Sequence, residues 1–169
     1  MKKLSFILAI ILLIISNIVN AQEVKTSKIS IGFGANALAV GKDEGLNLEG
    51  TLGYSLNSDA TLNLSISNAS MKSKNLDLNY GLSKYALQLN YDFAKIKTSK
   101  YESIFGFSYL NFDKKLALDE SNGLGLDLGI QASFYTNSRL YYGFRIVTTY
   151  SSFSPGGILN SGIFLKYKL

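Results

Sequence analysis

Apolar and polar residues alternate one by one through most of this chain, and this period of two constrains the fold more than any other feature. The clearest runs carry an apolar residue at every second position, as in Leu46 to Leu56, Leu62 to Ile66, Tyr85 to Phe93 and Leu124 to Phe134. Successive side chains of a β-strand point to opposite faces, so the alternation predicts strands with one apolar and one polar face. Helical spacing of apolar residues does not occur after the N-terminal segment. The sequence therefore predicts an all-β fold.

Eight strands account for the alternation. We place them at 29–38, 46–56, 60–69, 81–93, 101–111, 123–134, 139–150 and 158–168. Most have the roughly 9–11 residues that a tilted strand needs to cross a bilayer. Short connections at 57–59, 94–100 and 135–138 alternate with longer ones at 39–45, 70–80, 112–122 and 151–157. This is the pattern of an antiparallel up-and-down transmembrane barrel with short periplasmic turns, longer outer loops and both termini in the periplasm.

The N-terminal segment has the features of a secretory signal peptide. Lys2 and Lys3 precede an apolar run from Leu4 to Ile15, and Val19-Asn20-Ala21 resembles a cleavage site. The apolar run is shorter than the roughly 20 residues of a membrane-spanning helix. We therefore predict a signal peptide at 1–21 and a barrel domain at 22–169. The formal charge of +5 then falls to +3 once the two lysines are removed.

The polar rows of the strands distinguish two kinds of barrel. A soluble, lipocalin-like barrel that binds a ligand in the periplasm would show charged rows to water. Here the polar rows consist mainly of Gly, Ser, Thr, Asn and Gln, and charges concentrate in the connections. Small neutral residues suit the narrow lumen of an eight-stranded barrel. The rows therefore favour a membrane barrel with an outward apolar face, and the soluble barrel is kept as an alternative.

Aromatic residues cluster near the strand ends, where a membrane barrel carries interfacial girdles. The predicted periplasmic girdle contains Tyr54, Tyr91, Phe93, Tyr101, Phe134, Tyr142 and Tyr167. The predicted outer girdle contains Tyr80, Tyr109, Phe112, Tyr150 and Phe153.

Four charged residues interrupt otherwise neutral polar rows: Glu49, Asp127, Arg145 and Lys166. Charges inside a membrane protein face the interior and pair with one another. We therefore predict a salt-bridged plug centred on Arg145 that keeps the lumen closed. A selective narrow pore is the alternative function for the same residues.

Several classes of function are disfavoured by missing residue types. The chain has no His and no Cys, so it lacks the most frequent general base, the most frequent transition-metal ligand and any thiolate. We predict no catalytic residues, no metal site and no cofactor. The mild charge indicates no nucleic-acid partner. Lysines predicted on the outer rim would contact phosphorylated lipid such as lipopolysaccharide; they are Lys42, Lys72, Lys74, Lys84, Lys114 and Lys115.

The C-terminal strand carries a resemblance to a known family. Gly162 is followed by alternating apolar positions through Leu165, Tyr167 and Leu169, which resembles the β-signal of outer-membrane proteins. The terminal residue is Leu169 where that family more often has Phe. With its eight strands, the chain resembles the small outer-membrane barrels of the OmpA, OmpX and OmpW type.

The resemblance carries expectations about biogenesis and role. It implies a bacterial outer-membrane location, insertion by the barrel-assembly machinery and a monomeric state. It also implies a non-enzymatic structural or surface-interaction role. A narrow channel for small or apolar solutes is the alternative that the OmpW type suggests. Enzymes among such barrels depend on His, which this chain lacks.

Overall fold

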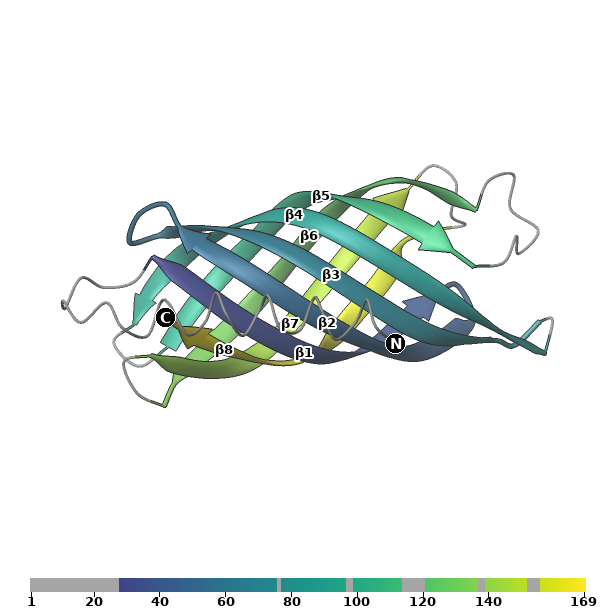
Figure 1. Ribbon diagram of the computed structural model, residues 1–169, viewed down its shortest axis with the longest axis horizontal. Helices are drawn as coiled ribbons and strands as arrows, with labels where there is room; N and C mark the ends of the chain where they lie inside the picture. Colours follow the sequence, from purple (N-terminus) through teal and green to yellow (C-terminus); the bar gives the residue numbers. More distant parts are fainter. Residues whose placement is uncertain (1–27, 76, 97–98, 114–120, 137–138, 152–155) are drawn as a thin grey trace, which may run out of the picture.

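The computed structural model describes residues 28–75, 77–96, 99–113, 121–136, 139–151 and 156–169, and it confirms the predicted all-β barrel. Eight antiparallel strands follow one another around a closed ring, and the first pairs with the last (Figure 1). They are β1 Ile29–Val40, β2 Asp43–Ser55, β3 Ala60–Ser73, β4 Leu78–Ile96, β5 Ser99–Phe112, β6 Asn122–Tyr135, β7 Leu140–Ser151 and β8 Ile158–Lys168. The predicted signal peptide lies outside the described residues. Among those residues, no helix has the length and apolar character needed to cross a membrane.

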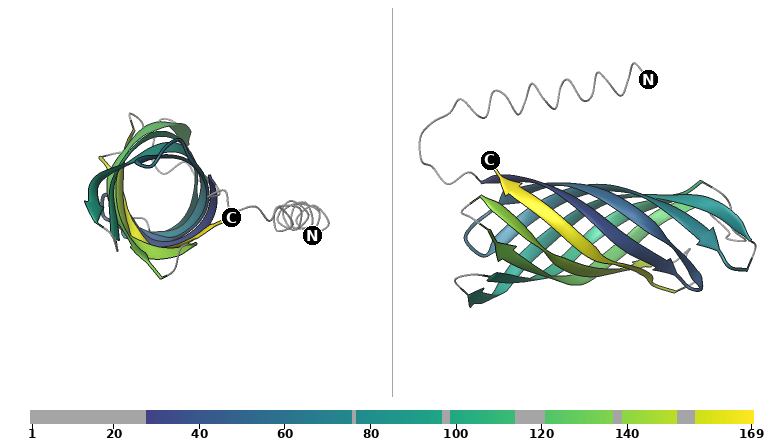
Figure 2. Two further views of the ribbon diagram at one scale, coloured as in Figure 1. Left: turned by 90° about the vertical axis from the view of Figure 1, so that its left-hand side faces the viewer. Right: turned by 90° about the horizontal axis from the view of Figure 1, so that it is seen from below.

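The pairing register fixes the tilt of the strands. Stepping from Ile29 through successive paired residues around the ring returns to Ala39, ten residues further along β1. A stagger of this size in an eight-stranded barrel requires strands tilted by roughly 35–45°. The view along the barrel shows the closed ring that results (Figure 2). Such a ring leaves no unpaired strand edge, so the backbone is satisfied without solvent.

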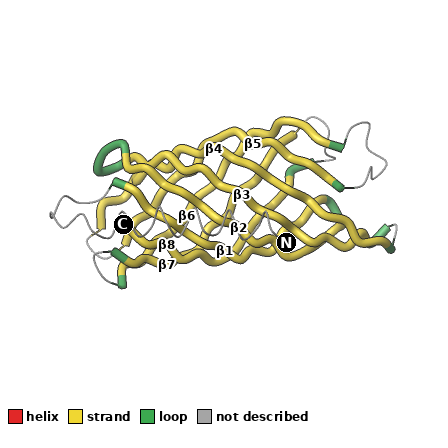
Figure 3. Tube along the Cα trace, in the orientation of Figure 1, coloured by secondary structure: helices red, strands yellow, loops and turns green. Residues whose placement is uncertain are grey.

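The two ends of the barrel differ, and we name them by their contents. The terminal end holds Lys28, Leu169 and the connections 56–59, 97–98 and 136–139. The loop end holds the connections 41–42, 74–77, 113–121 and 152–157. Strands make up nearly all of the described chain between them (Figure 3).

Two of the four long loops that we predicted at the loop end are not present in the structure. The predicted loops 39–45 and 70–80 are mostly strand, and turns of only two and four residues replace them. In the first, Gly41 has a φ of 59°, a left-handed conformation that suits the first central residue of a tight hairpin turn. Beyond their predicted ends, these strands contribute the buried apolar side chains of Val40, Met71 and Tyr80 to the lumen.

The outward face carries an apolar band in the middle of the barrel. Its exposed members come from every strand and include Phe33, Leu48, Leu52, Leu64, Ile66, Leu87, Phe105, Phe107, Ile130, Phe144, Ile146 and Ile163. A soluble barrel would hide these side chains, whereas hydrocarbon favours them. The described surface is therefore built to span a membrane.

Near the loop end the polarity of the strands reverses. Outward positions there are polar and exposed: Glu44, Ser70, Lys72, Asn79, Asn111 and Asp113. The inward positions are apolar and buried: Leu38, Val40, Ala69, Met71, Tyr80, Leu82, Leu110, Phe112 and Ile158. Beyond the apolar band, the strands thus resemble those of a soluble barrel, with a wet outside and a dry inside.

Candidate functional site

The lumen is the candidate site, because its inward rows contain the buried charges of the described chain. Along β4 the inward row runs from Tyr80 and Leu82 to Lys84 and Gln88, moving from the loop end toward the terminal end. Along β8 it runs from Ile158 to Lys166 in the same direction. The lumen is therefore layered, with an apolar layer at the loop end and charged layers below it.

The apolar layer is the buried cluster of Leu38, Val40, Ala69, Met71, Tyr80, Leu82, Leu110, Phe112 and Ile158, which we call the lumen cap. Its members come from β1, β3, β4, β5 and β8, so it spans the bore rather than lining one wall. The rings of Tyr80 and Phe112 contact each other with centroids 5.9 Å apart. Below the cap, the space between Leu82, Lys84 and Thr149 is too small for a water molecule. The described residues therefore leave no water-sized space directly below the cap at this point.

The first charged layer centres on Asp127, which is fully buried. Its carboxylate accepts hydrogen bonds from Lys84 at 2.9 Å and from Gln88 at 2.6 Å. Ser108 and Thr149 donate at 2.9 and 2.7 Å. The four donors come from three strands: two from β4, one from β5 and one from β7. This carboxylate therefore ties four side chains together across the lumen.

A second ion pair joins Arg145 of β7 to Glu49 of β2. Both side chains are buried, and Asn36 of β1 lies within hydrogen-bond distance of the same carboxylate oxygen at 3.4 Å. The pair is less complete than the first layer. Glu49 Oε1 and Arg145 Nε make no hydrogen bond among the described residues. The pair nevertheless crosses the bore, because β2 and β7 do not neighbour each other in the ring.

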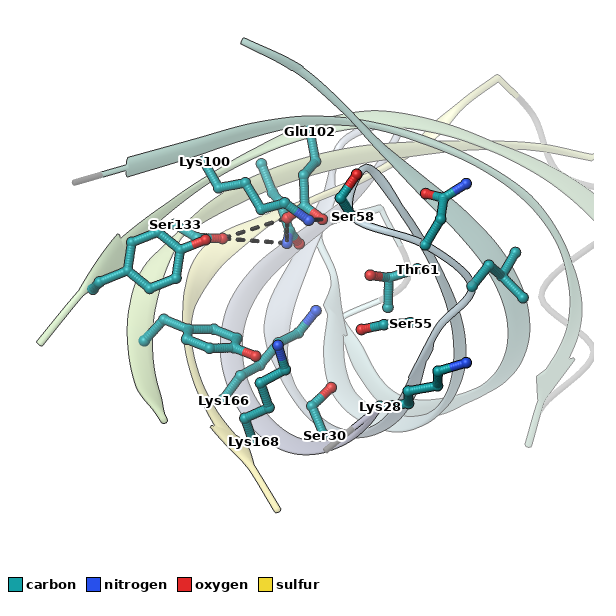
Figure 4. Close-up of a pocket in the computed structure, with 15 residues that line it drawn as sticks. Lys28, Ser30, Ser55, Ser58, Thr61, Lys100, Glu102, Ser133, Lys166 and Lys168 are labelled. Atoms are coloured by element: carbon teal, nitrogen blue, oxygen red, sulfur yellow. Dashed lines mark hydrogen bonds and ion pairs between the residues drawn. The ribbon is translucent and has the colours of Figure 1, made fainter. Parts of the chain in front are cut away.

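At the terminal end the lumen opens into a cavity of about 430 Å³, which we call the vestibule (Figure 4). Glu102 is buried on its wall and accepts hydrogen bonds from Lys100 at 3.3 Å and from Gln131. Ser133 lies 3.4 Å from the same carboxylate. Lys28, Lys166 and Lys168 also line the vestibule. It is thus a polar pocket that faces the compartment at the terminal end.

The structure brings the four predicted lumen charges inside the barrel but not into one network. Arg145 pairs with Glu49, and Asp127 pairs with Lys84. Lys166 forms no ion pair among the described residues and lies in the vestibule. Of the four predicted residues, only Arg145 and Glu49 pair with each other in the described part of the chain, and the closing of the lumen by these charges stays a prediction.

Lys84 was predicted on the outer rim, and that placement is wrong. Its side chain is buried in the lumen because it lies on the inward, even-numbered row of β4. Of the other rim lysines, Lys72 lies 3.8 Å from Asp77 and Lys74 lies 3.2 Å from Glu44. Lys42 is exposed, whereas Lys114 and Lys115 lie outside the described residues. Contact of the rim with lipopolysaccharide stays a prediction.

Most of the predicted interfacial aromatics lie on the outward face. Among the exposed ones, Tyr54, Tyr91, Phe93, Tyr142 and Tyr167 lie near the terminal end, and Tyr109 and Tyr150 lie toward the loop end. Tyr101 and Phe134 are partly exposed at strand ends. Tyr80 and Phe112 were predicted in the outer girdle, but they face inward as part of the lumen cap. Phe153 lies outside the described residues.

The predicted β-signal forms the C-terminal strand and its end. Gly162, Leu165 and Tyr167 lie in β8, which pairs with β1 and β7, and the backbone N–H of Leu169 donates to Ile29 O at 3.0 Å. Gly162 faces the lumen, where an added Cβ would come within 2.6 Å of Asn36 Oδ1. This strand therefore closes the barrel, and its recognition by assembly machinery stays a prediction.

The described residues contain no cluster of three or more acidic side chains that would hold a metal ion. One contact has the form of a nucleophile beside a base, since Thr149 Oγ1 lies 2.7 Å from Lys84 Nζ. Thr149 is fully buried, and the space beside it does not admit water, so no substrate reaches it. This contact is therefore shut off from solvent.

The sequence matches no protein-family model and no curated protein sequence. The fold is similar to that of solved outer-membrane proteins. OprG from Pseudomonas aeruginosa matches with a TM-score of 0.61 at 12% identity, over 85% of this chain and 98% of that one. A major outer membrane protein from Thermus thermophilus matches at 0.60 and 15%, over 83% and 99%. The outer membrane enzyme PagL matches at 0.58 and 15%, over 83% and 99%.

The chain therefore has the fold of the small eight-stranded outer-membrane barrels, and the resemblance inferred from the sequence is confirmed.

Proposed function

We propose that the protein is a non-enzymatic, non-conducting barrel that anchors its loop end at the surface of the bacterial outer membrane. The outward apolar band supports the membrane location, and the fold supports the outer membrane. The terminal end then faces the periplasm, in keeping with the short turns found there. The loop end carries the polar outward residues and faces the medium.

The lumen cap is the observation that carries the proposal. Its nine apolar side chains fill the bore at the loop end, and Leu110, Met71 and Ile158 are at most 1% exposed. Two ion pairs cross the bore below it. An ion passing through would have to displace both a packed apolar layer and the partners of buried charges. We therefore expect a barrel without a continuous water path.

The alternatives are less well supported by the same geometry. A narrow channel would need an opening at both ends, whereas the vestibule opens only at the terminal end. A soluble ligand-binding barrel would need a polar outside, which the apolar band contradicts. The fold also supports enzymes, as PagL illustrates, but this chain has no His and its buried Thr149 is inaccessible.

Single-channel recording in planar bilayers tests the proposal. We expect no steady conductance from the wild-type barrel. Openings should appear when bulk is removed from both closing layers, as in a Phe112→Ala/Arg145→Ala double variant. The matched control is Phe107→Ala, which removes an outward ring from the same strand as Phe112 and should stay silent. Steady openings of the wild-type protein would overturn the proposal.

A further inference from the structure

The vestibule has no role in a barrel that is closed at its other end, so its composition calls for a separate explanation. We propose that the vestibule binds a small phosphate-bearing anion that enters from the periplasmic side. The cap and the ion pairs above it prevent passage, so this is a binding site and not a transport path. The proposal goes beyond the anchoring role, and it rests on the proposed function for the closed bore and for the periplasmic position of the terminal end.

An excess of positive charge lines the vestibule. Four lysines line it, Lys28, Lys100, Lys166 and Lys168, against the single carboxylate of Glu102. Lys100 is 3.3 Å from that carboxylate, which also accepts from Gln131. The other three ammonium groups form no ion pair within the described part of the chain. Three like charges around one pocket repel each other until an anion joins them.

Lys166 carries the argument furthest, because it is a buried charge that forms no ion pair among the described residues. Glu102 and Glu49 act on it only from beyond salt-bridge distance. Only 7% of it is exposed, and its Nζ has one hydrogen bond among the described residues, a long one of 3.5 Å to Asn63 Oδ1. Its Nζ lies 5.4 Å from the centroid of the Phe164 ring, which contributes a weak cation–π contact. Burying an ammonium with so little compensation costs several kcal/mol in general, so buried charges are normally paired.

The barrel wall is shaped to hold Lys166 in this position. Gly32 of β1 lies beside its stem, and a Cβ added there would come within 2.7 Å of Lys166 Cγ. The side chains of Lys166 and Lys168, from the same strand, reach into the same opening (Figure 4). Ser30 lies beside them, and Ser55 and Thr61 lie across from them. The lysines therefore point at a shared space that hydroxyl donors surround.

These donors fit a phosphate group. Its oxygens accept several hydrogen bonds at once, and lysine binds it as a point charge. The cavity of about 430 Å³ is much larger than inorganic phosphate, within the size range of sites for small organic ligands. The geometry thus points to a phosphate ester with the phosphate on Lys166 and Lys168.

Isothermal titration of the refolded barrel with inorganic phosphate tests the site. The protein is held in octyl glucoside, which has no phosphate of its own, and ionic strength is kept constant with chloride. We expect saturable binding that Lys166→Met weakens about ten- to a hundredfold, the range for one charge-assisted hydrogen bond. Lys168→Met should weaken it as well. Lys72→Met, an exposed lysine at the loop end, is the matched control and should leave binding unchanged.

The outcomes separate folding from binding and one source of phosphate from another. Heat-modifiable migration on gels shows whether each variant is folded, and Lys168→Met provides a second test if Lys166→Met is not. Binding that persists in phosphatidylglycerol nanodiscs assigns the site to a soluble ligand. Binding that is lost there assigns the same phosphate recognition to a lipid headgroup. No saturable binding by the wild type, or equal binding by both folded vestibule variants, overturns the proposal.

Discussion

The pair of Lys84 and Asp127 allows a quantitative test of how the lumen holds together. Asp127 is 0% exposed and accepts from four donors, and Lys84 Nζ bonds both Asp127 and Thr149. Removing one partner leaves an uncompensated buried charge, which costs about 3–5 kcal/mol. We therefore expect Asp127→Asn and Lys84→Met each to lower the free energy of unfolding by about that amount.

The double variant gives the sharper result. With both charges gone, the Asn side chain at position 127 keeps neutral partners in Gln88, Ser108 and Thr149, so the double variant should cost about as much as one single variant. The coupling between the two sites then equals the cost of one single variant, about 3–5 kcal/mol, which is at or above the upper end of what contacting residues show.

Urea unfolding in lipid vesicles measures these free energies. The chain has 11 Tyr and no Trp, so tyrosine fluorescence or circular dichroism follows the transition. The matched control is the exposed pair of Lys74 and Glu44, 3.2 Å apart, whose coupling should lie within about 0–1 kcal/mol. Additive effects of the two lumen substitutions would refute the reasoning, as would single variants that cost less than about 1 kcal/mol.

Three further predictions concern other layers of the barrel, and urea unfolding reports on each. Leu64→Arg places a charge in the middle of the apolar band and should cost about 2–4 kcal/mol, whereas Ser70→Arg on the same strand should cost about 0–1. Equal costs would contradict the position of the band. Gly143→Val should prevent folding, because an added Cβ would collide with the backbone oxygen of Ala132 and would also lie within 2.8 Å of the ring of Phe164. A stable, correctly migrating variant would show that the backbone of the wall can move apart at this position. Lys166→Met should raise the stability of the phosphate-free protein by about 1 kcal/mol or more, since it removes an unpaired buried charge, and a loss of stability would indicate an overlooked partner.

Much of the fold follows from the period of two in the sequence. The strands of the predicted barrel overlap all eight observed strands, because each is long and alternates strictly over its membrane-spanning part. The inward direction of Glu49, Asp127 and Arg145 also follows, since a charge in an otherwise neutral row is excluded from hydrocarbon. The alternation was sufficient to predict a strand and the direction of its side chains wherever the apolar residues of that strand face outward.

The side chains that were misplaced from the sequence lie near the loop end, where the apolar residues of a strand no longer face outward. Tyr80 and Phe112 are aromatic residues near strand ends, and only the reversal at the loop end shows that they face inward. The signal was present in the sequence, because Ser70, Lys72 and Asn111 are polar at positions where the outward row should continue apolar. The pairing of Lys84 with Asp127 could not be predicted in this way. It depends on the stagger around the ring, which brings together residues 43 positions apart.

The reversal of polarity also fixes how deep the barrel sits in a bilayer. If it sank by one inward–outward pair of residues along β3, Lys72 would approach the hydrocarbon, and if it rose by as much, apolar side chains at the loop-end edge of the band, such as Ile66, would enter water. Both displacements are unfavourable in free energy, and this holds whatever the loops contact. A bilayer thinner or thicker than the apolar band must then adapt its own thickness around the barrel, because a closed ring of paired strands tilts and compresses little. The height of the apolar band therefore selects a bilayer thickness, and the protein should partition toward membrane regions whose hydrocarbon thickness matches the band.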